Sequence, residues 1–291
     1  MNTTICQIVD SAGSLPSDFI ENHNIKEVAF YFKFEKTDYL RENIDYSARD
    51  FFKHMEEYPN DVPKTAAPNP HDWLSLFQEK YNKGARKYIV TTISSKLSNS
   101  FQAAMSAKAL FEEENKDIKI DVIDSNTCAC GQAALEIWIA NMIGNRMDFE
   151  DIVEKIYKMR SKVNSLFVVD SLKYMEAGGR IGKATAFLGK MTNIKPISEF
   201  INGEVHVIRP SIGRKRSLRL MIDEAVSRIN DINKAIITIQ NAKAEKDADY
   251  MRNYLLEKAN KDVEIFSSDL GITVGAHSGP GAIGIGFLET F

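Results

Sequence analysis

Short apolar segments alternate with longer amphipathic segments along the first half of the chain. The apolar runs at 4–9, 86–93 and 118–125 are rich in β-branched residues and predict buried strands. The segments that follow them place apolar residues at helical spacing and predict helices. This alternation of strand, loop and helix favours a parallel sheet with helices on both faces.

Further elements are expected in this half: a strand at 26–34 and helices at 47–57, 71–82, 101–113, 131–143 and 148–162. Ser47 and Asp50 stand in capping-box positions at the start of the first of these helices. In helix 101–113, Phe101, Met105 and Ala109 recur at four-residue spacing and predict its apolar face.

The pattern changes near residue 163. We expect a strand at 165–171, a short helix within 172–182, an apolar helix at 184–192, a hairpin at 197–208, a helix at 217–229, and a strand–helix–strand unit at 235–239, 243–258 and 263–266. Asn202-Gly203 is a strong hairpin-turn signal. A hairpin combined with crossover connections predicts an α+β domain at 163–291, following an α/β domain at 1–162.

Composition and charge restrict the function. The chain has 291 residues, of which 44% are hydrophobic and 26% charged, as in a globular protein. A formal net charge of -3 gives no electrostatic attraction to nucleic acid or anionic lipid. No apolar run approaches the roughly 20 residues of a membrane span, and the first residues do not resemble a signal peptide. We therefore expect a cytoplasmic protein.

Metal and nucleotide sites are not expected. Among the three cysteines, Cys128 and Cys130 form a C-x-C pair without a second Cys/His pair, which argues against a disulfide framework and against zinc. Neither G-x-G-x-x-G after the first strand nor a phosphate-binding G-x-x-x-x-G-K-[ST] motif occurs.

Candidate ligand-binding residues with polar side chains lie in three of the expected loops. Asp10 and Ser11 come directly after the first strand, where open α/β sheets bind ligands. A serine-rich loop at 94–100, with Ser94 and Ser98, lies between a strand and a helix N-terminus, where anions bind. The proline-rich loop 63–70 fixes the backbone around Thr65. Helix capping, or a rigid linker at 63–70, explains the same residues equally well.

The glycine-rich stretch 275–286 is the last candidate. Glycine lets backbone approach a ligand closely, and His277 supplies a donor near neutral pH. The alternative is a glycine-rich turn before an edge strand at 283–287, with His277 only capping it.

Together these segments resemble the DegV family of bacterial fatty-acid-binding proteins. The matching segments occur in the family's order and span nearly the whole chain: 8–11, 64–70, 93–104, 178–182, 193–197 and 277–284. The resemblance implies a two-domain DegV-like fold with a lipid between the domains. It further implies a carrier that binds a long-chain fatty acid, such as palmitate, stearate or oleate, without a cofactor. Such carriers present the acid to a separate fatty-acid kinase that makes an acyl phosphate, a role compatible with transient membrane contact.

The family motifs identify candidate residues for the carboxylate. Thr65, Ser98 and His277 match the family's threonine, serine and histidine, and Ser94 and Ser11 are further candidates. The chain departs from the family pattern at Ala66 and Ala67, where the family usually has Ser-Gln, and at Asn99, where it usually has Gly. These departures affect how the head group is bound.

Two further hypotheses concern the basic residues and catalysis. Arg180 matches the arginine of the family's Gly-Gly-Arg motif, and Arg209 and Arg214 lie in a second basic loop. They form either a docking patch for the kinase or a solvated surface paired with acids. The alternative function is an acyl hydrolase with Ser98 or Ser94 as nucleophile and His277 as base, although no G-x-S-x-G motif surrounds any serine.

Overall fold

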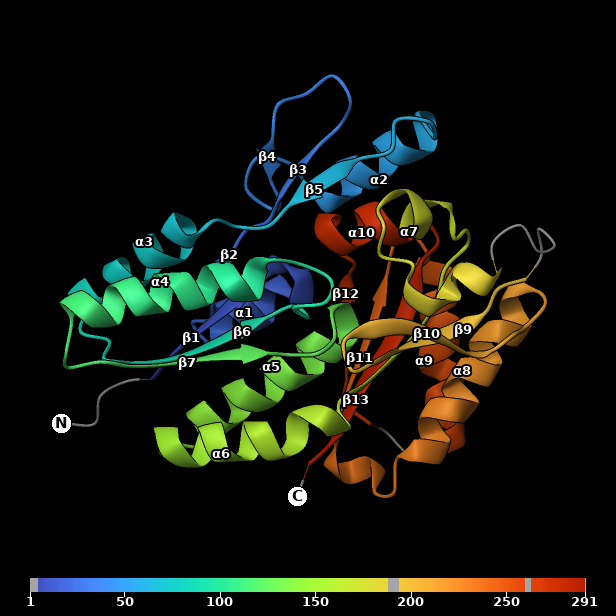
Figure 1. Ribbon diagram of the computed structural model, residues 1–291. Coiled ribbons are helices and arrows are strands. Elements are labelled where there is room, and N and C mark those ends of the chain that lie inside the picture. The colour runs from blue at the N-terminus through green and yellow to red at the C-terminus, as the bar shows by residue number, and fades with distance from the viewer. Residues whose placement is uncertain (1–4, 188–193, 260–262, 291) are drawn as a thin grey trace.

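The computed structural model describes residues 5–187, 194–259 and 263–290, whose strands form three sheets (Figure 1). The first sheet has the order β2-β1-β6-β7, and all its pairings are parallel. Its strands are β1 (Ile5–Asp10), β2 (Lys26–Val28), β6 (Lys87–Thr92) and β7 (Lys119–Asp124). The parallel sheet expected for the first half is therefore confirmed.

A small sheet with the order β4-β3-β5 stands above this layer in Figure 1. It consists of β3 (Tyr31–Lys33), β4 (Leu40–Arg41) and β5 (Lys64–Ala66), all antiparallel. The single strand expected at 26–34 is thus wrong, because β2 joins the parallel sheet and β3 joins the small one. Part of the proline-rich loop is also a strand, β5.

Helices cover both faces of the parallel sheet: α1 (Ser17–Asn22), α3 (Pro70–Asn82), α4 (Ser100–Glu114), α5 (Ala129–Gly144) and α6 (Phe149–Met159), while α2 (Ala48–Glu57) packs by the small sheet. Successive side chains of β6 point to opposite faces of the parallel sheet. Tyr88 and Val90 join the core beneath α3 and α4, whereas Ile89 joins the core formed with α5 and α6. Ser47 caps α2 by accepting from Asp50 N–H, as expected.

The face expected for α4 is wrong. Met105 is 37% exposed, whereas Ala103, Ala104, Ala107 and Phe111 are buried. These residues also follow helical spacing, and their small side chains let α4 lie close to α3 and the sheet. Side-chain size at the contact, and not hydrophobicity alone, selected the buried face.

The third sheet is mixed, with the order β10-β9-β8-β13-β11-β12. Its strands are β8 (Asn164–Val168), β9 (Ile197–Ile201), β10 (Glu204–Arg209), β11 (Ala235–Asn241), β12 (Ile265–Asp269) and β13 (Ile283–Glu289). β13 pairs with both β8 and β11, so the alternative of an edge strand at 283–287 is wrong. Its glycines admit α5: a Cβ at Gly286 would lie 2.1 Å from Cys130 O.

Two local predictions for the second half are confirmed. Asn202 and Gly203 have φ of 50° and 84° at the turn between β9 and β10. β11 and β12 pair in parallel across a helix.

The helices of the second half are α7 (Lys173–Ala177), α8 (Arg214–Arg228), α9 (Glu245–Ala259) and α10 (Ile272–Ser278). Of the helix expected at 184–192, residues 182–187 form a 3-10 helix, and 188–192 lie outside the described residues, as does residue 193 of the segment 193–197.

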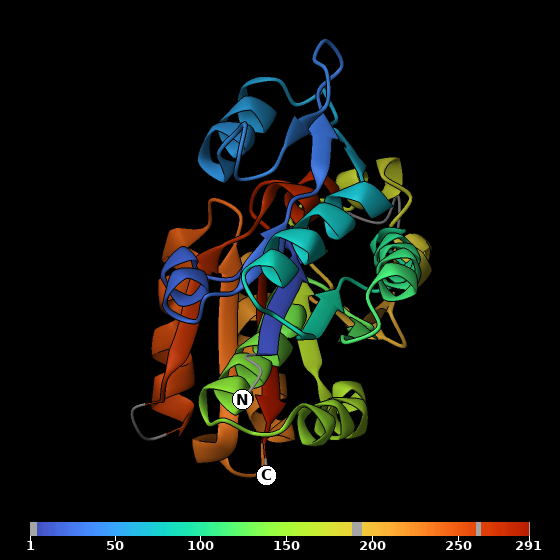
Figure 2. The ribbon, with the colours of Figure 1, turned by 90° about the vertical axis from the view of Figure 1, so that its left-hand side faces the viewer.

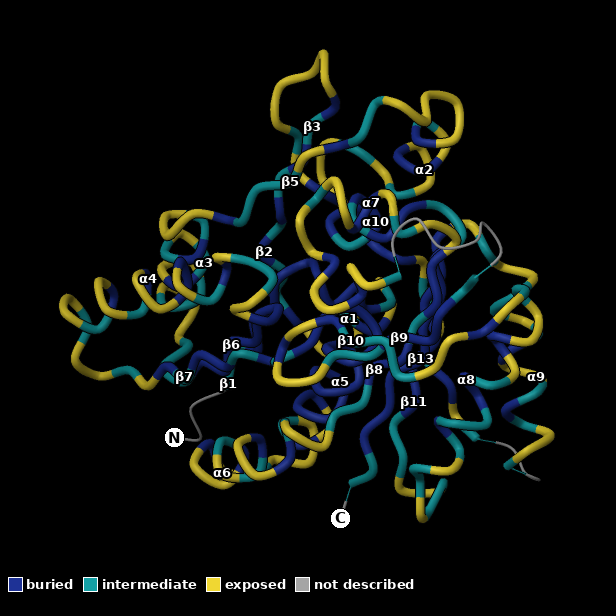
Figure 3. The backbone as a smooth tube through the Cα atoms, turned by 45° about the vertical axis from the view of Figure 1, so that its right-hand side comes forward, coloured by how far each residue is buried: buried dark blue, intermediate teal, exposed yellow. Residues whose placement is uncertain are grey.

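Helix α5 lies between the two large sheets and is buried on nearly all sides (Figures 2 and 3). It packs against β1 of the parallel sheet and against β8, β11 and β13 of the mixed one. The chain leaves the parallel sheet after β7 and enters the mixed sheet at β8, but α5, which lies between these two strands in the sequence, packs against both sheets. The domain boundary at 162/163 therefore stays a prediction. No helix in the described parts of the chain is long and apolar enough to cross a membrane.

Candidate functional site

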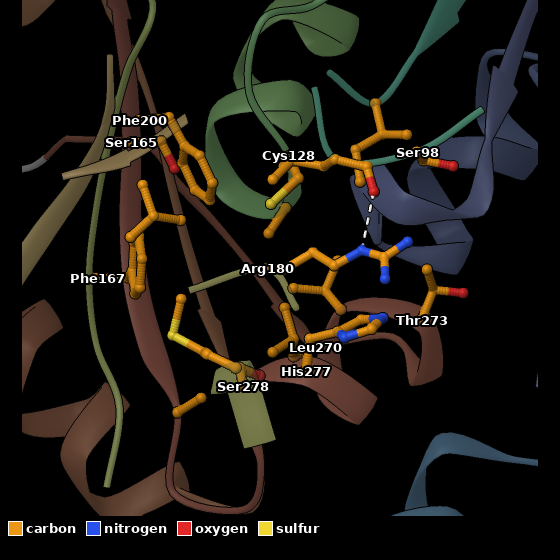
Figure 4. Close-up of a pocket in the computed structure, with 18 of the residues that line it drawn as sticks. Ser98, Cys128, Ser165, Phe167, Arg180, Phe200, Leu270, Thr273, His277 and Ser278 are labelled. Carbon is orange, nitrogen blue, oxygen red and sulfur yellow. Dashed lines mark hydrogen bonds between the residues drawn. The ribbon is translucent and has the colours of Figure 1, made fainter. Parts of the chain in front are cut away.

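A cavity opens where the three sheets approach one another (Figure 4). Its volume is about 210 Å³, counting positions open to the centre of a water molecule. Thr65 from β5, Ser98 from the loop before α4, and His277 from α10 all line it. The structure thus brings together three candidates that are far apart in the sequence.

Thr65 and His277 form a hydrogen-bonded pair at one end of this cavity. The distance between Thr65 Oγ1 and His277 Nε2 is 2.8 Å. Burial and the positive charge of Arg180 lower the pKa of His277 to about 4. His277 is therefore neutral at pH 7. Its Nδ1 is buried and has no hydrogen-bond partner among the described residues.

Glycine is required beside the His277 ring. A Cβ at Gly178 would lie 2.0 Å from His277 Nδ1, so the end of α7 lies directly against the imidazole. This contact, together with the bond to Thr65, fixes the ring orientation.

Ser98 lines the cavity next to the start of α4. Its Oγ accepts a hydrogen bond from Ser100 N–H at 3.2 Å. The hydroxyl is therefore a local cap, and accepting this bond leaves its hydrogen available to a ligand. Capping and ligand binding, the two readings of this serine, are compatible in this geometry.

Arg180 also lines the cavity, which the docking-patch hypothesis did not anticipate. Its Nε donates to Leu97 O at 3.1 Å and its Nη1 to Gly178 O at 2.6 Å, while the residue stays exposed. Figure 4 shows the guanidinium between the Ser98 loop and His277. A positive charge is thus held at the polar end of the cavity.

The rest of the cavity is mainly apolar. Its lining includes Ile93, Cys128, Cys130, Phe167, Met175, Phe200, Val205 and Leu270. Phe167 and Phe200 stack with ring centroids 5.2 Å apart. Burial raises the pKa of the Cys130 thiol to about 11 and that of Cys128 well above its usual value, so both thiols stay neutral. Sequence reasoning missed these residues, although Phe167 lies in an expected strand.

Ser94 and Ser11 do not line the cavity. Ser94 Oγ donates to Gly203 O at 3.0 Å and so ties the end of β6 to the β9–β10 hairpin. Ser11 Oγ donates to Glu42 at 2.8 Å and accepts from Phe30 N–H at 3.0 Å. Each hydroxyl is used inside the protein, which removes both serines from the proposed ligand set.

The second basic loop is partly neutralised. Arg214 pairs with Asp247 at 2.8 Å and with Asp170 at 3.4 Å, and its side chain is only 22% exposed. Lys195 also pairs with Asp170, at 3.2 Å. Arg209 is exposed at the end of β10. Arg180 and Arg209 are both exposed, whereas Arg214 is held in ion pairs, and the docking role of these arginines stays a prediction.

The head-group end is less polar than the family pattern implies. Ala67 lines the cavity close in sequence to Thr65, and both alanines that replace the usual polar pair are half-buried.

The geometry around His277 does not support the alternative of an acyl hydrolase. His277 Nε2 bonds to Thr65 and its Nδ1 faces Gly178, so the ring is not paired with Ser98 as a general base. No metal-binding cluster of His, Cys, Asp and Glu occurs in the described chain.

A mainly apolar cavity with a polar end, set between α/β layers, is typical of proteins that bind an amphipathic small molecule. The chain belongs to the DegV family, whose model, described as "Uncharacterised protein, DegV family", matches residues 4–290. A DegV domain-containing protein of Clostridium acetobutylicum is 30% identical over 98% of this chain and 99% of its own length.

Two solved structures are similar in fold. A stearic-acid-binding protein from Eubacterium ventriosum has a TM-score of 0.91 at 25% identity, covering 99% of this chain and 98% of that chain. DegV from Bacillus subtilis, described as a fatty acid binding protein, has a TM-score of 0.87 at 25% identity, covering 99% of this chain and 100% of that one.

Proposed function

We propose that this protein binds a long-chain fatty acid, with the carboxylate at Thr65, Ser98 and His277 and the acyl chain along Phe167 and Phe200. The observation that carries the proposal is the cavity itself, whose lining is mainly apolar and which has the hydrogen-bonded Thr65–His277 pair at one end. The fatty acids bound by the similar proteins of E. ventriosum and B. subtilis support the same ligand class.

The physical chemistry fits this ligand. A buried carboxylate needs donors, and Thr65, Ser98 and Arg180 can supply hydroxyl and charged N–H groups at one end. Each buried CH₂ contributes about 0.8 kcal/mol, so a long acyl chain can dominate the affinity without any cofactor.

The protein acts as a carrier in this proposal. Arg180 is exposed at the polar end, so the carboxylate would lie toward the surface, where a separate kinase could reach it. The kinase would transfer the terminal phosphoryl group of ATP to a carboxylate oxygen and release ADP and an acyl phosphate. The arrangement around His277 does not favour hydrolysis as a competing function.

Calorimetry with delipidated protein tests the ligand class. Stearic acid should bind more tightly than stearyl alcohol or methyl stearate, because only the acid presents a charged acceptor to Thr65 and Arg180. Equal affinity for all three would show that the cavity binds chains without recognising a carboxylate, and the proposed head-group site would be wrong.

A further inference from the structure

We propose that Glu42 is a positioning residue that clasps helix α10 to the small sheet and thereby holds His277 against Thr65. This inference rests on the proposed function only for its binding readout. The clasp itself joins two elements that carry the head-group donors, since Thr65 lies on β5 and His277 near the end of α10.

Glu42 follows β4 directly and is fully buried. Its carboxylate accepts three hydrogen bonds: from Ser11 Oγ at 2.8 Å, from Thr273 N–H at 3.2 Å, and from Thr273 Oγ1 at 2.5 Å. Two of the three come from a single residue in the first turn of α10. Glu42 therefore binds the start of α10, the helix that carries His277 near its end.

The geometry places two contacts side by side. Thr273 and His277 are four residues apart on α10 and so share one helix face. Leu40 and Thr65 both pair with Phe32 across the small sheet, and Glu42 lies two residues beyond Leu40. The Thr65–His277 and Glu42–Thr273 bonds thus join the same sheet to the same helix face.

The backbone of α10 is shaped around this carboxylate. A Cβ at Gly271, the residue before the helix, would lie 2.3 Å from Glu42 Oε1 and 2.9 Å from Ser14 Oγ. Gly271 N–H also donates to Ser14 Oγ at 2.9 Å. The helix start therefore fits against the Glu42 carboxyl with no room for a side chain between them.

Stability alone does not account for this arrangement. The three groups that donate to Glu42 are uncharged, and burial raises the pKa of Glu42 to about 7, with a further contribution from the negative charge of Glu27. A buried carboxyl without a cation is an unfavourable way to fill a core position. Glu42 instead fixes the position of α10, and with it the His277 ring, through hydrogen bonds that an apolar residue could not make.

The test compares Glu42→Ala, Glu42→Gln and Thr273→Val with wild type. Alanine removes the clasp. Glutamine can keep it, because its amide can donate to both hydroxyl oxygens while its carbonyl accepts from Thr273 N–H. Valine keeps the shape of Thr273 but loses the hydroxyl bond. Glu136→Ala is the matched control, since Glu136 is equally buried but contacts Gln132 and lies off α10.

Each variant is measured in two ways: the ratio of affinities for stearic acid and stearyl alcohol, and the ¹⁵N shifts of the His277 ring without ligand. Glu42→Ala should lower the acid-to-alcohol ratio by about tenfold, and Thr273→Val by a smaller factor. Both should move the Nε2 resonance. Glu42→Gln and Glu136→Ala should leave the ratio and the resonance close to wild type.

The outcomes separate the two proposals. If wild type itself does not prefer the acid, the proposed function fails, and the ring resonances still test the clasp. If wild type prefers the acid but Thr273→Val and Glu42→Ala keep both the ratio and the ring resonances, the positioning role is wrong. It is also wrong if Glu136→Ala loses selectivity as strongly, because selectivity would then follow stability. Thr273 also lines the cavity, so should Glu42→Ala not fold, the His277 ring resonances of Thr273→Val decide, and not its affinity ratio.

Discussion

Thr65 Oγ1 and His277 Nε2 lie 2.8 Å apart, although 212 residues separate them in the chain. One comes from a small antiparallel sheet and the other from a helix near the C-terminus. Their hydrogen bond lies at the polar end of a mainly apolar cavity. This bond and the contact with Gly178 fix both side chains, so a carboxylate bound there would meet donors whose orientation is already set.

Removing single donors tests the roles of the head-group residues. Thr65→Val, Ser98→Ala and His277→Ala should each weaken stearic acid binding by about 1–3 kcal/mol, the range for leaving a buried polar acceptor short of a partner. Stearyl alcohol should lose much less. Ser94→Ala is the matched control, because the Ser94 hydroxyl bonds to Gly203 O outside the cavity. Equal losses for acid and alcohol would mean that these residues only shape the cavity.

The protonation of His277 should respond to the ligand. Burial and the charge of Arg180 lower its pKa from 6.5 to about 4. A bound carboxylate should raise this pKa, because a nearby negative charge favours the imidazolium. Stearyl alcohol carries no charge and should not produce that increase. An NMR titration of the His277 ring in the free, acid-bound and alcohol-bound protein measures this difference.

The same pKa predicts how His277 affects stability. The unfolded chain binds the proton at a higher pH than the folded chain does. The contribution of His277 to the free energy of unfolding is therefore complete above about pH 6.5 and is lost as the pH falls toward 4. Denaturant unfolding of wild type and His277→Gln across this range should show a shallower decline for the variant. A steeper decline in the variant would contradict the lowered pKa.

The stacked aromatic pair should limit the acyl chain. Phe167→Ala removes a ring that lines the cavity and stacks on Phe200, so the preferred acid should become longer or bulkier. Competition among acids of increasing length measures the change. Phe266→Ala, another half-buried aromatic of the mixed sheet, lies outside the cavity and serves as control. An unchanged preference for acid length in Phe167→Ala would mean that the acyl chain does not lie along Phe167.

Variants of the three arginines should separate fatty-acid binding from phosphoryl transfer to the bound acid. Arg180 lines the cavity, so Arg180→Ala should weaken acid binding. Arg209→Ala should keep that affinity but slow acyl-phosphate formation by a cognate kinase, more so at low ionic strength. Arg214→Ala should chiefly lose its ion pairs with Asp170 and Asp247. If Arg209→Ala transfers at the wild-type rate, the docking role of Arg209 is wrong.

Local patterns predicted much of the fold. The strands of the parallel sheet and the Asn202-Gly203 hairpin follow from local patterns, and the parallel pairing of β11 with β12 follows from the order strand–helix–strand. The division of 26–34 between two sheets and the central place of β13 do not. Both depend on which strands meet in three dimensions, and that information is absent from local periodicity.

The candidate site shows the same limit. Sequence motifs pointed to Thr65, Ser98 and His277, which the structure places around one cavity. They also pointed to Ser94, whose hydroxyl is used by a carbonyl 109 residues away. Glu42 carried no signal at all, because a lone acid in a polar stretch looks like a surface residue until its partner on α10 is known.

Mass spectrometry of lipid extracted from protein purified under mild conditions tests the central claim most directly. The cavity and its Thr65–His277 end predict about one fatty acid per chain, and delipidated protein should take up added stearate or oleate at the same ratio. A purified protein without stoichiometric fatty acid, which also fails to bind either added acid, would contradict the proposed function.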